Sequence, residues 1–441
     1  MVTNTRTPIR LSDAAVIPLR TLDPAEPLDD LEWLDEVVGE ARVVAIGESA
    51  HYNAETYLLR HRLLRYLVER HGFDAYAMET GFTEGGLTDS RVRGGDERPG
   101  HVLAEGITSL MGLWTQMRAQ VQWIRDHNRV AARPVGFHGV DLGGGNVSLL
   151  PGLDAVTAYL AQADPEFTID PGVREAAVAF AAPSAFSAPA AFAAYAGLAP
   201  SARDALTAGL AELAARMAGR RLDYVARTSV EAYERALRSL HLVTVLDTVV
   251  RAIARGDQQT AMSNRDAGIA DTVEWVLGRH DRIVLAAHNG HIQRWPGTLP
   301  GMPPMTPAGL HLADRLGEDY VVIGTTTGTG RTLNDNPEQF YAGTLFTDLG
   351  APRPGSLDAL MADAHDGPFA ADLRRLSPAD TAAFQAVAEQ RMGTFYCDIN
   401  PLDAYDAIVH LPRVTAAEPD DDALAASPRE VQEPFARWER R

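Results

Sequence analysis

The chain has 441 residues, a formal net charge of −19 at pH 7 and a hydrophobic fraction of 46%. This length is enough for a large α/β body with an insertion, or for two to three average domains. The hydrophobic fraction is typical of a folded globular protein, and the strong negative charge argues against nucleic acid and anionic membranes as partners.

Two residue types are scarce enough to exclude whole classes of chemistry. All 40 basic residues are arginine, and Cys397 is the only cysteine. Without lysine there is no phosphate-loop lysine, no Schiff base and no Ser-Lys dyad. One cysteine excludes an intramolecular disulfide and a Cys-ligated structural zinc; Cys397 is either a nucleophile or, as is more usual, a core residue. No apolar run has the length of a signal peptide or a membrane span, so we expect a cytoplasmic protein.

Short β-branched runs that each end in polar residues predict buried parallel strands. There are five, at Val43–Gly47, Ala75–Glu79, Val135–Asp141, Ile283–Ala287 and Tyr320–Gly324. Apolar residues at helical spacing predict helices at Ala54–Arg70, Leu110–His127, Ala267–Gly278 and Leu310–Leu316. Because helices alternate with strands, the sequence predicts an α/β fold with a mostly parallel central sheet flanked by helices.

The strands stop at Pro151 and Ala-rich helical segments continue to about Gly256. We therefore expect residues 151–256 to be a helical insertion that acts as a cap or substrate wall, with ordinary packing as the alternative. Residues 1–150 and 257–412 would then form the catalytic core. Residues 413–441 are expected to be an acidic, loosely held C-terminal tail.

Polar side chains gather where the predicted strands end, which is where open α/β sheets bind ligands. They are Glu48 and His51, Glu79, His138 and Asp141, and His288 and His291. Each has an ordinary explanation alone: a helix cap for Glu48 or His51, a satisfied core histidine for His138. Burying several carboxylates and imidazoles together costs several kcal/mol unless all are paired. Their convergence therefore predicts an active site.

Carboxylates beside histidines support two mechanisms. A carboxylate can orient a histidine that takes a proton from water, with arginines stabilising the oxyanion. Alternatively, Glu and His can ligate a metal whose bound water ionises near neutral pH. The spacing does not separate them. The sequence has no G-x-S-x-G elbow, no H-E-x-x-H helix and no glycine fingerprint. We interpret Gly143–Gly145 as a flexible loop, and Thr325–Asn336 as a polar turn or a substrate contact.

Several separated motifs together resemble the erythromycin-esterase family. They are Ile46-Gly47-Glu48-Ser49-Ala50-His51 with Glu55 and Arg60, Met78-Glu79, Gly139-Val140-Asp141-Leu142, Asn264-Arg265-Asp266, and Ala287-His288-Asn289-Gly290-His291-Ile292-Gln293-Arg294. The resemblance implies an α/β core with helical additions and metal-independent hydrolysis of macrolide lactone rings without a cofactor.

The resemblance also implies roles for residues. His51 would be the general base, and Glu79 would position His51 or the water. Glu48 and His288 would complete the catalytic set. Arg60 would hold a carboxylate or bind the oxyanion, and the expected substrate-binding residues are Arg60, His291, Glu55, Asp141 and Arg265.

The predicted function is therefore a hydrolase that cleaves an ester or macrolactone, with a macrolide or other polyketide-like lactone as its small-molecule partner. Three alternatives stay open at this point. They are a non-hydrolytic biosynthetic enzyme that cyclises, dehydrates or isomerises such a compound, a metal-dependent hydrolase, and a binding protein without activity.

Overall fold

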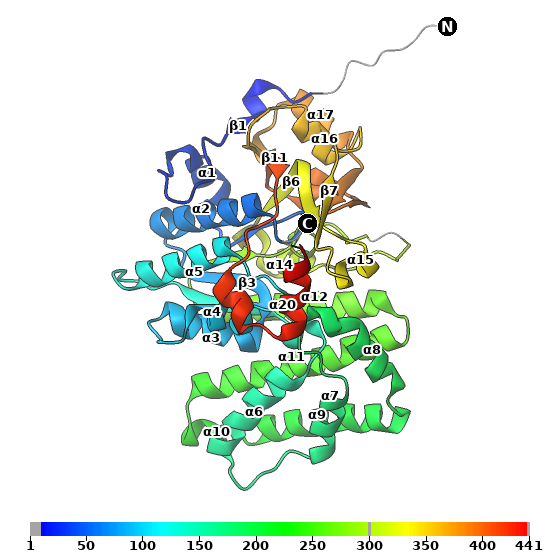
Figure 1. The fold of residues 1–441 in the computed structure, drawn as a ribbon. Coiled ribbons are helices and arrows are strands. Elements are labelled where there is room, and N and C mark those ends of the chain that lie inside the picture. Colours follow the sequence, from blue (N-terminus) through cyan, green and yellow to red (C-terminus); the bar gives the residue numbers. More distant parts are fainter. Residues whose placement is uncertain (1–9, 299–300, 439–441) are drawn as a thin grey trace. The chain divides into compact units, whose positions relative to one another are not determined.

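The computed structural model describes residues 10–298 and 301–438, and the chain divides into two compact units (Figure 1). Unit 1 contains Met1–Phe73 and Asp281–Glu418, and unit 2 contains Asp74–His280 and Pro419–Arg441. The boundaries between the units therefore follow residues 73, 280 and 418. They differ from the expected boundaries of the segments 151–256 and 413–441. The cap or substrate-wall role of residues 151–256 stays a prediction.

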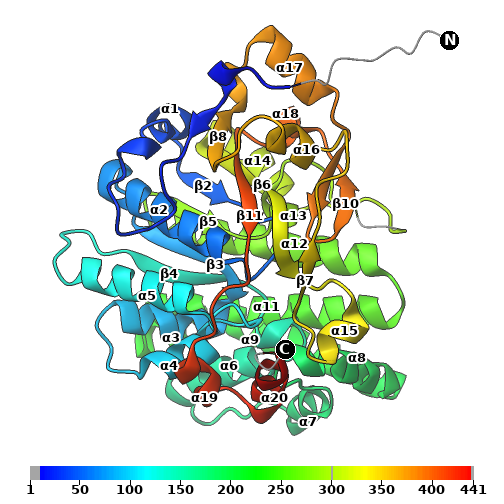
Figure 2. The ribbon, with the colours of Figure 1, turned by 45° about the horizontal axis from the view of Figure 1, so that its top comes forward.

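Unit 1 is built on a sheet whose strands lie in the order β1, β8, β11, β6, β2 and β5, with β7 paired to β6 (Figure 2). The neighbours β11, β6, β2 and β5 are parallel, whereas β1, β8 and β7 form antiparallel pairs. The bounds are β1 Ile17–Pro18, β2 Val43–Ile46, β5 Ile283–Ala286, β6 Tyr320–Leu333, β7 Phe346–Leu349, β8 Phe369–Asp372 and β11 Ala407–Val414, and a separate hairpin joins β9 Glu389–Met392 to β10 Phe395–Asp398. All four residues of β2, VVAI, are buried, as expected for a central parallel strand.

The longest helix of unit 1 within the described residues is α2, Ala54–His71, which ends where Gly72 adopts a left-handed conformation with φ 68°. This helix packs against β5 and β11, whereas α14 and α16 pack against β6. The other helices of unit 1 are α1 Leu34–Val38, α13 Asn289–Ile292, α14 Ala308–Leu316, α15 Pro337–Tyr341, α16 Leu357–Ala362, α17 Pro378–Gln385 and α18 Pro401–Ala404. The carboxyl ends of the parallel strands lead into the loops that carry the predicted site.

Unit 2 contains the parallel strands β3, Ala75–Gly81, and β4, Gly136–Asp141, with α3 and α12 packed on β4. The strand-free segment that the sequence predicts is helical, and its helices lie together around α11 (Figure 1). The helices of unit 2 are α3 Phe82–Val92, α4 Pro99–Gly106, α5 Thr115–Asn128, α6 Leu150–Ala163, α7 Pro171–Ala179, α8 Ala188–Gly197, α9 Pro200–Gly219, α10 Arg221–Arg227, α11 Val230–Ala254, α12 Gln258–Leu277, α19 Asp421–Ala426 and α20 Arg429–Trp438. In residues 10–298 and 301–438, no helix has both the length and the apolar character needed to cross a bilayer.

The α/β prediction is confirmed, and each of the five predicted strands is present. The polar-turn interpretation of Thr325–Asn336 is wrong for most of that segment, because β6 continues to Leu333. Glycine allows this continuation: a Cβ on Gly328 would lie 2.1 Å from the carbonyl oxygen of Pro412 in the neighbouring strand β11. The Gly- and Thr-rich sequence of this segment is typical of a loop, but the segment is a strand that pairs closely with β11.

The expectation of a loosely held C-terminal tail is also wrong for its described part. Val431 and Phe435 of α20 are buried, and the Phe435 ring lies 5.4 Å from that of Trp114. Asp420 pairs with Arg118 of α5 and caps α19 through the backbone nitrogen of Ala423. The acidic composition concealed a few apolar residues that anchor this segment to unit 2.

Candidate active site

Gly47 and Asn289, which follow β2 and β5, form hydrogen bonds with the neighbouring strand β6 in unit 1. The backbone nitrogen of Gly47, just after β2, donates to Ile323 of β6 at 2.8 Å, and a Cβ at Gly47 would come within 1.9 Å of Asn289 Oδ1. The buried Asn289 side chain exchanges hydrogen bonds with the backbone of Thr325, at 2.7 and 3.2 Å. Position 47 therefore requires glycine, and the loops that follow β2 and β5 are held together beside Thr325 of β6.

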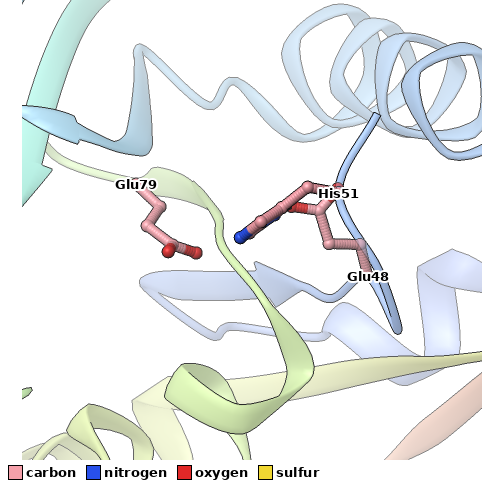
Figure 3. Close-up of side chains that lie close together, drawn as sticks. All are labelled: Glu48, His51 and Glu79. Carbon is pink, nitrogen blue, oxygen red and sulfur yellow. The ribbon is translucent and has the colours of Figure 1, made fainter. Parts of the chain in front are cut away.

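The loop after β2 places Glu48 beside His51 (Figure 3), and Arg60 of α2 pairs with Glu48. His51 Nδ1 lies 2.7 Å from Glu48 Oε1, and Arg60 Nη1 of α2 lies 3.0 Å from Glu48 Oε2. The side chains of Glu48 and Arg60 are 3% and 2% exposed, whereas that of His51 is 23% exposed. A buried carboxylate thus orients a histidine that solvent can reach, and an arginine supplies the opposite charge.

The second terminal nitrogen of Arg60, Nη2, forms hydrogen bonds with the backbone. Its Nη2 donates to the carbonyl oxygens of Ile46, at 3.1 Å, and Ala287, at 2.6 Å, which lie at or just after the ends of β2 and β5. Arg60 thus contacts both the Glu48 carboxylate and the ends of two strands, and both of its expected roles stay predictions. The residue after His51, Tyr52, has φ 63°, an uncommon left-handed conformation for a side chain of that size and a sign of local strain.

His288 lies beside His51 in a fixed orientation, with ring centroids 5.3 Å apart and the rings edge to face. Its Nδ1 accepts a hydrogen bond from the backbone nitrogen of Gly290 at 3.1 Å, so a neutral His288 carries its proton on Nε2. That nitrogen donates to the carbonyl oxygen of Ser49 at 3.2 Å. His291, also predicted as a site residue, is buried on α13, where its backbone nitrogen donates to the carbonyl oxygen of His288.

Unit 2 contains a second cluster of predicted site residues. Glu79, labelled in Figure 3, lies in β3, and Asp141 ends the neighbouring strand β4. Arg265 of α12 bonds both oxygens of Asp141, at 2.9 and 2.5 Å, and Glu79 Oε1 at 3.2 Å. Burial alone would lower the pKa of Arg265, but the two carboxylates outweigh burial and raise it. Three residues that the sequence analysis named separately therefore form one ion-pair cluster.

Two other predicted residues have contacts that explain them structurally. The Glu55 carboxylate accepts hydrogen bonds from the backbone nitrogen and hydroxyl of Thr415, at 2.7 and 2.8 Å. Its predicted role in substrate binding stays a prediction. His138 Nε2 lies 2.9 Å from His280 Nε2, and burial keeps the pKa of His138 well below its usual value. His138 is thus a paired core histidine, the ordinary interpretation of the sequence.

Asp335 is a residue near this site that the sequence analysis did not single out. It follows β6, and its Oδ2 accepts hydrogen bonds from the backbone nitrogen and hydroxyl of Thr394, at 2.7 and 2.9 Å. Burial raises the pKa of Asp335, while the Thr394 hydrogen bonds and the charge of His51 act in the opposite direction. Asp335 lies within the polar run Thr325–Asn336, so the signal was present but pointed to no particular residue.

A histidine that a carboxylate orients at the strand ends of an α/β fold is an arrangement that proton-transfer enzymes use, so this cluster is a candidate active site. The chain belongs to the erythromycin esterase family, whose model matches residues 68–414. It is 29% identical over 339 residues to erythromycin esterase type II of Escherichia coli, covering 73% of this chain and 77% of that protein.

Solved structures share the fold. One is a Bacillus cereus protein, with a TM-score of 0.78, 19% identity and coverage of 92% of this chain and 97% of that one. Another is a mutant of the erythromycin esterase EreC in its open conformation, with a TM-score of 0.74, 22% identity and coverage of 90% and 97%. At these identities the likeness concerns the fold, which agrees with the mostly parallel α/β architecture described above.

Proposed function

We propose that this protein hydrolyses an ester or macrolactone with water that His51 activates. The observation that carries the proposal is the 2.7 Å contact between His51 Nδ1 and the buried Glu48 carboxylate. A histidine held in this way accepts a proton at Nε2, and the carboxylate stabilises the resulting imidazolium. The water oxygen then bonds to the acyl carbon, the ester C–O bond breaks, and the proton passes to the leaving alcohol.

We assign the remaining residues from their contacts. Arg60 positions Glu48 and neutralises its charge, and His288, with its proton on Nε2, limits the orientations open to the neighbouring His51 ring. The Arg265 cluster holds Glu79, which we propose as the second catalytic carboxylate. His291 and Asp335 are proposed to contact substrate.

The proposed substrate class is a macrolide or a related polyketide lactone. The curated relative is an erythromycin esterase that this chain covers over most of its length, which supports the class. A scaffold does not by itself fix a substrate, because pocket walls vary more easily than the residues that activate water.

A metal-dependent hydrolase is the second candidate. Glu48 and His51 of unit 1 each offer an atom that a metal ion could bind. A carboxylate and an imidazole are ligands that Zn²⁺ accepts, and bound Zn²⁺ would lower the pKa of a water ligand. The Arg60 contact with Glu48 favours the metal-free mechanism, because a guanidinium already neutralises that carboxylate.

Mass spectrometry of erythromycin and simpler lactones incubated with purified protein, with and without a strong chelator, tests both candidates. A product heavier by one water in both samples is expected. Loss of this product with chelator and its return with Zn²⁺ would establish the metal-dependent mechanism instead. A new product of unchanged mass would indicate isomerisation, and loss of water would indicate elimination; either would overturn hydrolysis, as would recovery of every lactone intact.

A further inference from the structure

A cavity of about 480 Å³ lies within unit 2, and no residue assigned a role so far is among its lining residues. Its walls come from the turn before α5, the start of α6, the segment before α8 and the link between α19 and α20, and they are largely apolar. Ile107, Leu110, Leu113, Leu150 and Val431 are among the lining residues. This volume lies in the range of small-molecule sites.

The ionisable residues that line the cavity are all acidic. They are Glu84, Glu105 and Asp154, and no arginine or histidine is among the lining residues that the structure describes. Asp154 pairs with Arg174, and Glu105 is exposed to solvent. Glu84 is the third residue of α3. Of the three carboxylates, its negative charge is the one that solvent and neighbouring cations stabilise least.

The surroundings of Glu84 leave one oxygen unused. Its Oε1 accepts a hydrogen bond from the backbone nitrogen of Gly144 at 2.6 Å. Its Oε2 is shielded from solvent and lacks a hydrogen-bond partner among the described residues. Burial raises the pKa of Glu84, and the charge of Asp141 adds to that effect. A buried carboxylate in this state is costly to ionise unless a cation approaches it.

Two glycines, Gly81 and Gly144, allow the backbone to lie close to the Glu84 carboxyl group. A Cβ on Gly81 would come within 2.4 Å of Glu84 Oε2, so the carboxyl group fits against a bare glycine. Gly144, which bonds Oε1, has φ 59°. The segment Gly143–Gly145, which the sequence suggested was a flexible loop, thus holds a specific carboxylate.

Two consecutive non-glycine residues on the cavity wall are left-handed. Ser109 has φ 57° and Leu110 has φ 61°, and both line the cavity. L-residues rarely adopt this conformation, and such strain collects at ligand sites. The last torsion of a glutamate side chain turns easily, so a ligand can draw Oε2 toward the cavity without moving the backbone.

We propose that this cavity binds a small organic ammonium ion, with the Glu84 carboxylate as its counter-ion and the apolar walls around its hydrocarbon part. An anion would meet three carboxylates, and a neutral compound would leave Glu84 without a partner. The site takes a protonated amine on a compact apolar body. The proposal does not depend on hydrolysis, because it concerns binding within unit 2 alone.

Isothermal titration calorimetry on the full chain at pH 8 tests the proposal with 1-adamantylammonium chloride and, as its neutral counterpart, 1-adamantanol. The ammonium ion is expected to bind at least tenfold more tightly than the alcohol. In Glu84→Gln the affinity for the ammonium ion should fall at least tenfold, whereas the affinity for the alcohol should stay the same. The matched control Glu105→Gln removes an exposed charge from the same wall and should change ammonium affinity less than threefold.

Three results would overturn the proposal. They are no binding of 1-adamantylammonium to the unaltered protein, equal binding of the alcohol, and unaltered ammonium binding by Glu84→Gln. If Glu84→Gln does not fold, as judged by circular dichroism, the variant Ala182→Trp decides. It places a large side chain at a partly exposed position of the wall and should abolish binding, and retained binding would locate the ammonium ion elsewhere.

Discussion

The ends of β2 in unit 1 and of β3 and β4 in unit 2 each present a buried glutamate bonded to a helical arginine, but the two arrangements differ. Glu48 has Arg60 to itself, and Nη2 of Arg60 binds the carbonyl groups of Ile46 and Ala287. Glu79 shares Arg265 with Asp141. One carboxylate and one guanidinium sum to zero charge, whereas two carboxylates and one guanidinium sum to −1.

This difference separates two uses of the same residue types. In unit 1 the charges cancel, and the carboxylate has an imidazole on its second oxygen, so the arrangement suits proton transfer. In unit 2 the cluster keeps one negative charge in excess, and both oxygens of Asp141 bond the guanidinium of Arg265. The second arrangement fixes the position of Glu79 and maintains a negative potential. The following predictions rest on this contrast.

The largest effect is expected from His51→Asn. Loss of a general base costs about 10²–10⁴-fold in turnover. Asparagine keeps a polar side chain at this partly exposed position, so the melting temperature should change little. Steady-state kinetics on the lactone that the wild type cleaves, with His101→Asn as an exposed-histidine control, measures the effect. Near-normal turnover in His51→Asn would remove His51 from the mechanism.

Arg60→Ala should strongly destabilise the protein. It leaves Glu48 buried without its cation and two carbonyl groups without a donor, a change that typically costs about 3–5 kcal/mol. Asp141→Asn is the matched change in unit 2 and should cost less, about 1.5–3 kcal/mol, because Arg265 keeps Glu79 as a partner. Urea denaturation of both variants gives the two values. An equal or larger cost for Asp141→Asn would show that Glu79 alone does not compensate the charge of Arg265.

A pH-dependent effect is expected from Asp358, a carboxylate of unit 1 that accepts hydrogen bonds from the backbone nitrogens of Thr327 and Arg391. Burial raises the pKa of Asp358 from 3.8 to about 6. A pKa raised by folding means that the group stabilises the fold fully below pH 4, and that this contribution is lost as the pH rises through 6.

The difference corresponds to about 3 kcal/mol at 1.36 kcal/mol per pKa unit. It is measured by subtracting the free energy of unfolding of Asp358→Asn, which does not titrate at this position, from that of the wild type between pH 4 and pH 8. A difference that stays constant over this range would mean that the two backbone nitrogens keep Asp358 ionised at all these pH values.

The sequence predicted those features that depend on local pattern. The β-branched runs predicted five of the six parallel strands in the described residues, and the residues at their ends include the Glu48–His51 pair. Three kinds of feature were hidden. β11 and β8 were not predicted, although β11 has a buried, mostly apolar run from Ala407 to Leu411. The glycines of β6 resemble a turn, and the anchoring of α20 depends on Trp114, a residue more than 300 positions earlier in the chain. Contacts remote in sequence leave no local signal.

The same limit applies to the site. The sequence named Arg60 but not the carbonyl groups that it binds, and it gave Asn289 only as one letter of a motif. Glu84 went unnoticed because an isolated glutamate at the start of a helix is ordinary. Its significance depends on the absence of a cation around it, which only three-dimensional packing can show.

The carbonyl oxygen of Ser49 has a consequence for protein engineering. It accepts hydrogen bonds both from His288 and from the backbone nitrogen of Gly393, the first residue of the turn between β9 and β10. Gly393 has φ 59°, and a Cβ there would lie 2.4 Å from Asp335 Oδ2. Libraries that lengthen this turn or randomise Gly393 should therefore yield mostly inactive clones, whereas diversity on β10, beginning at Phe395, leaves this junction intact.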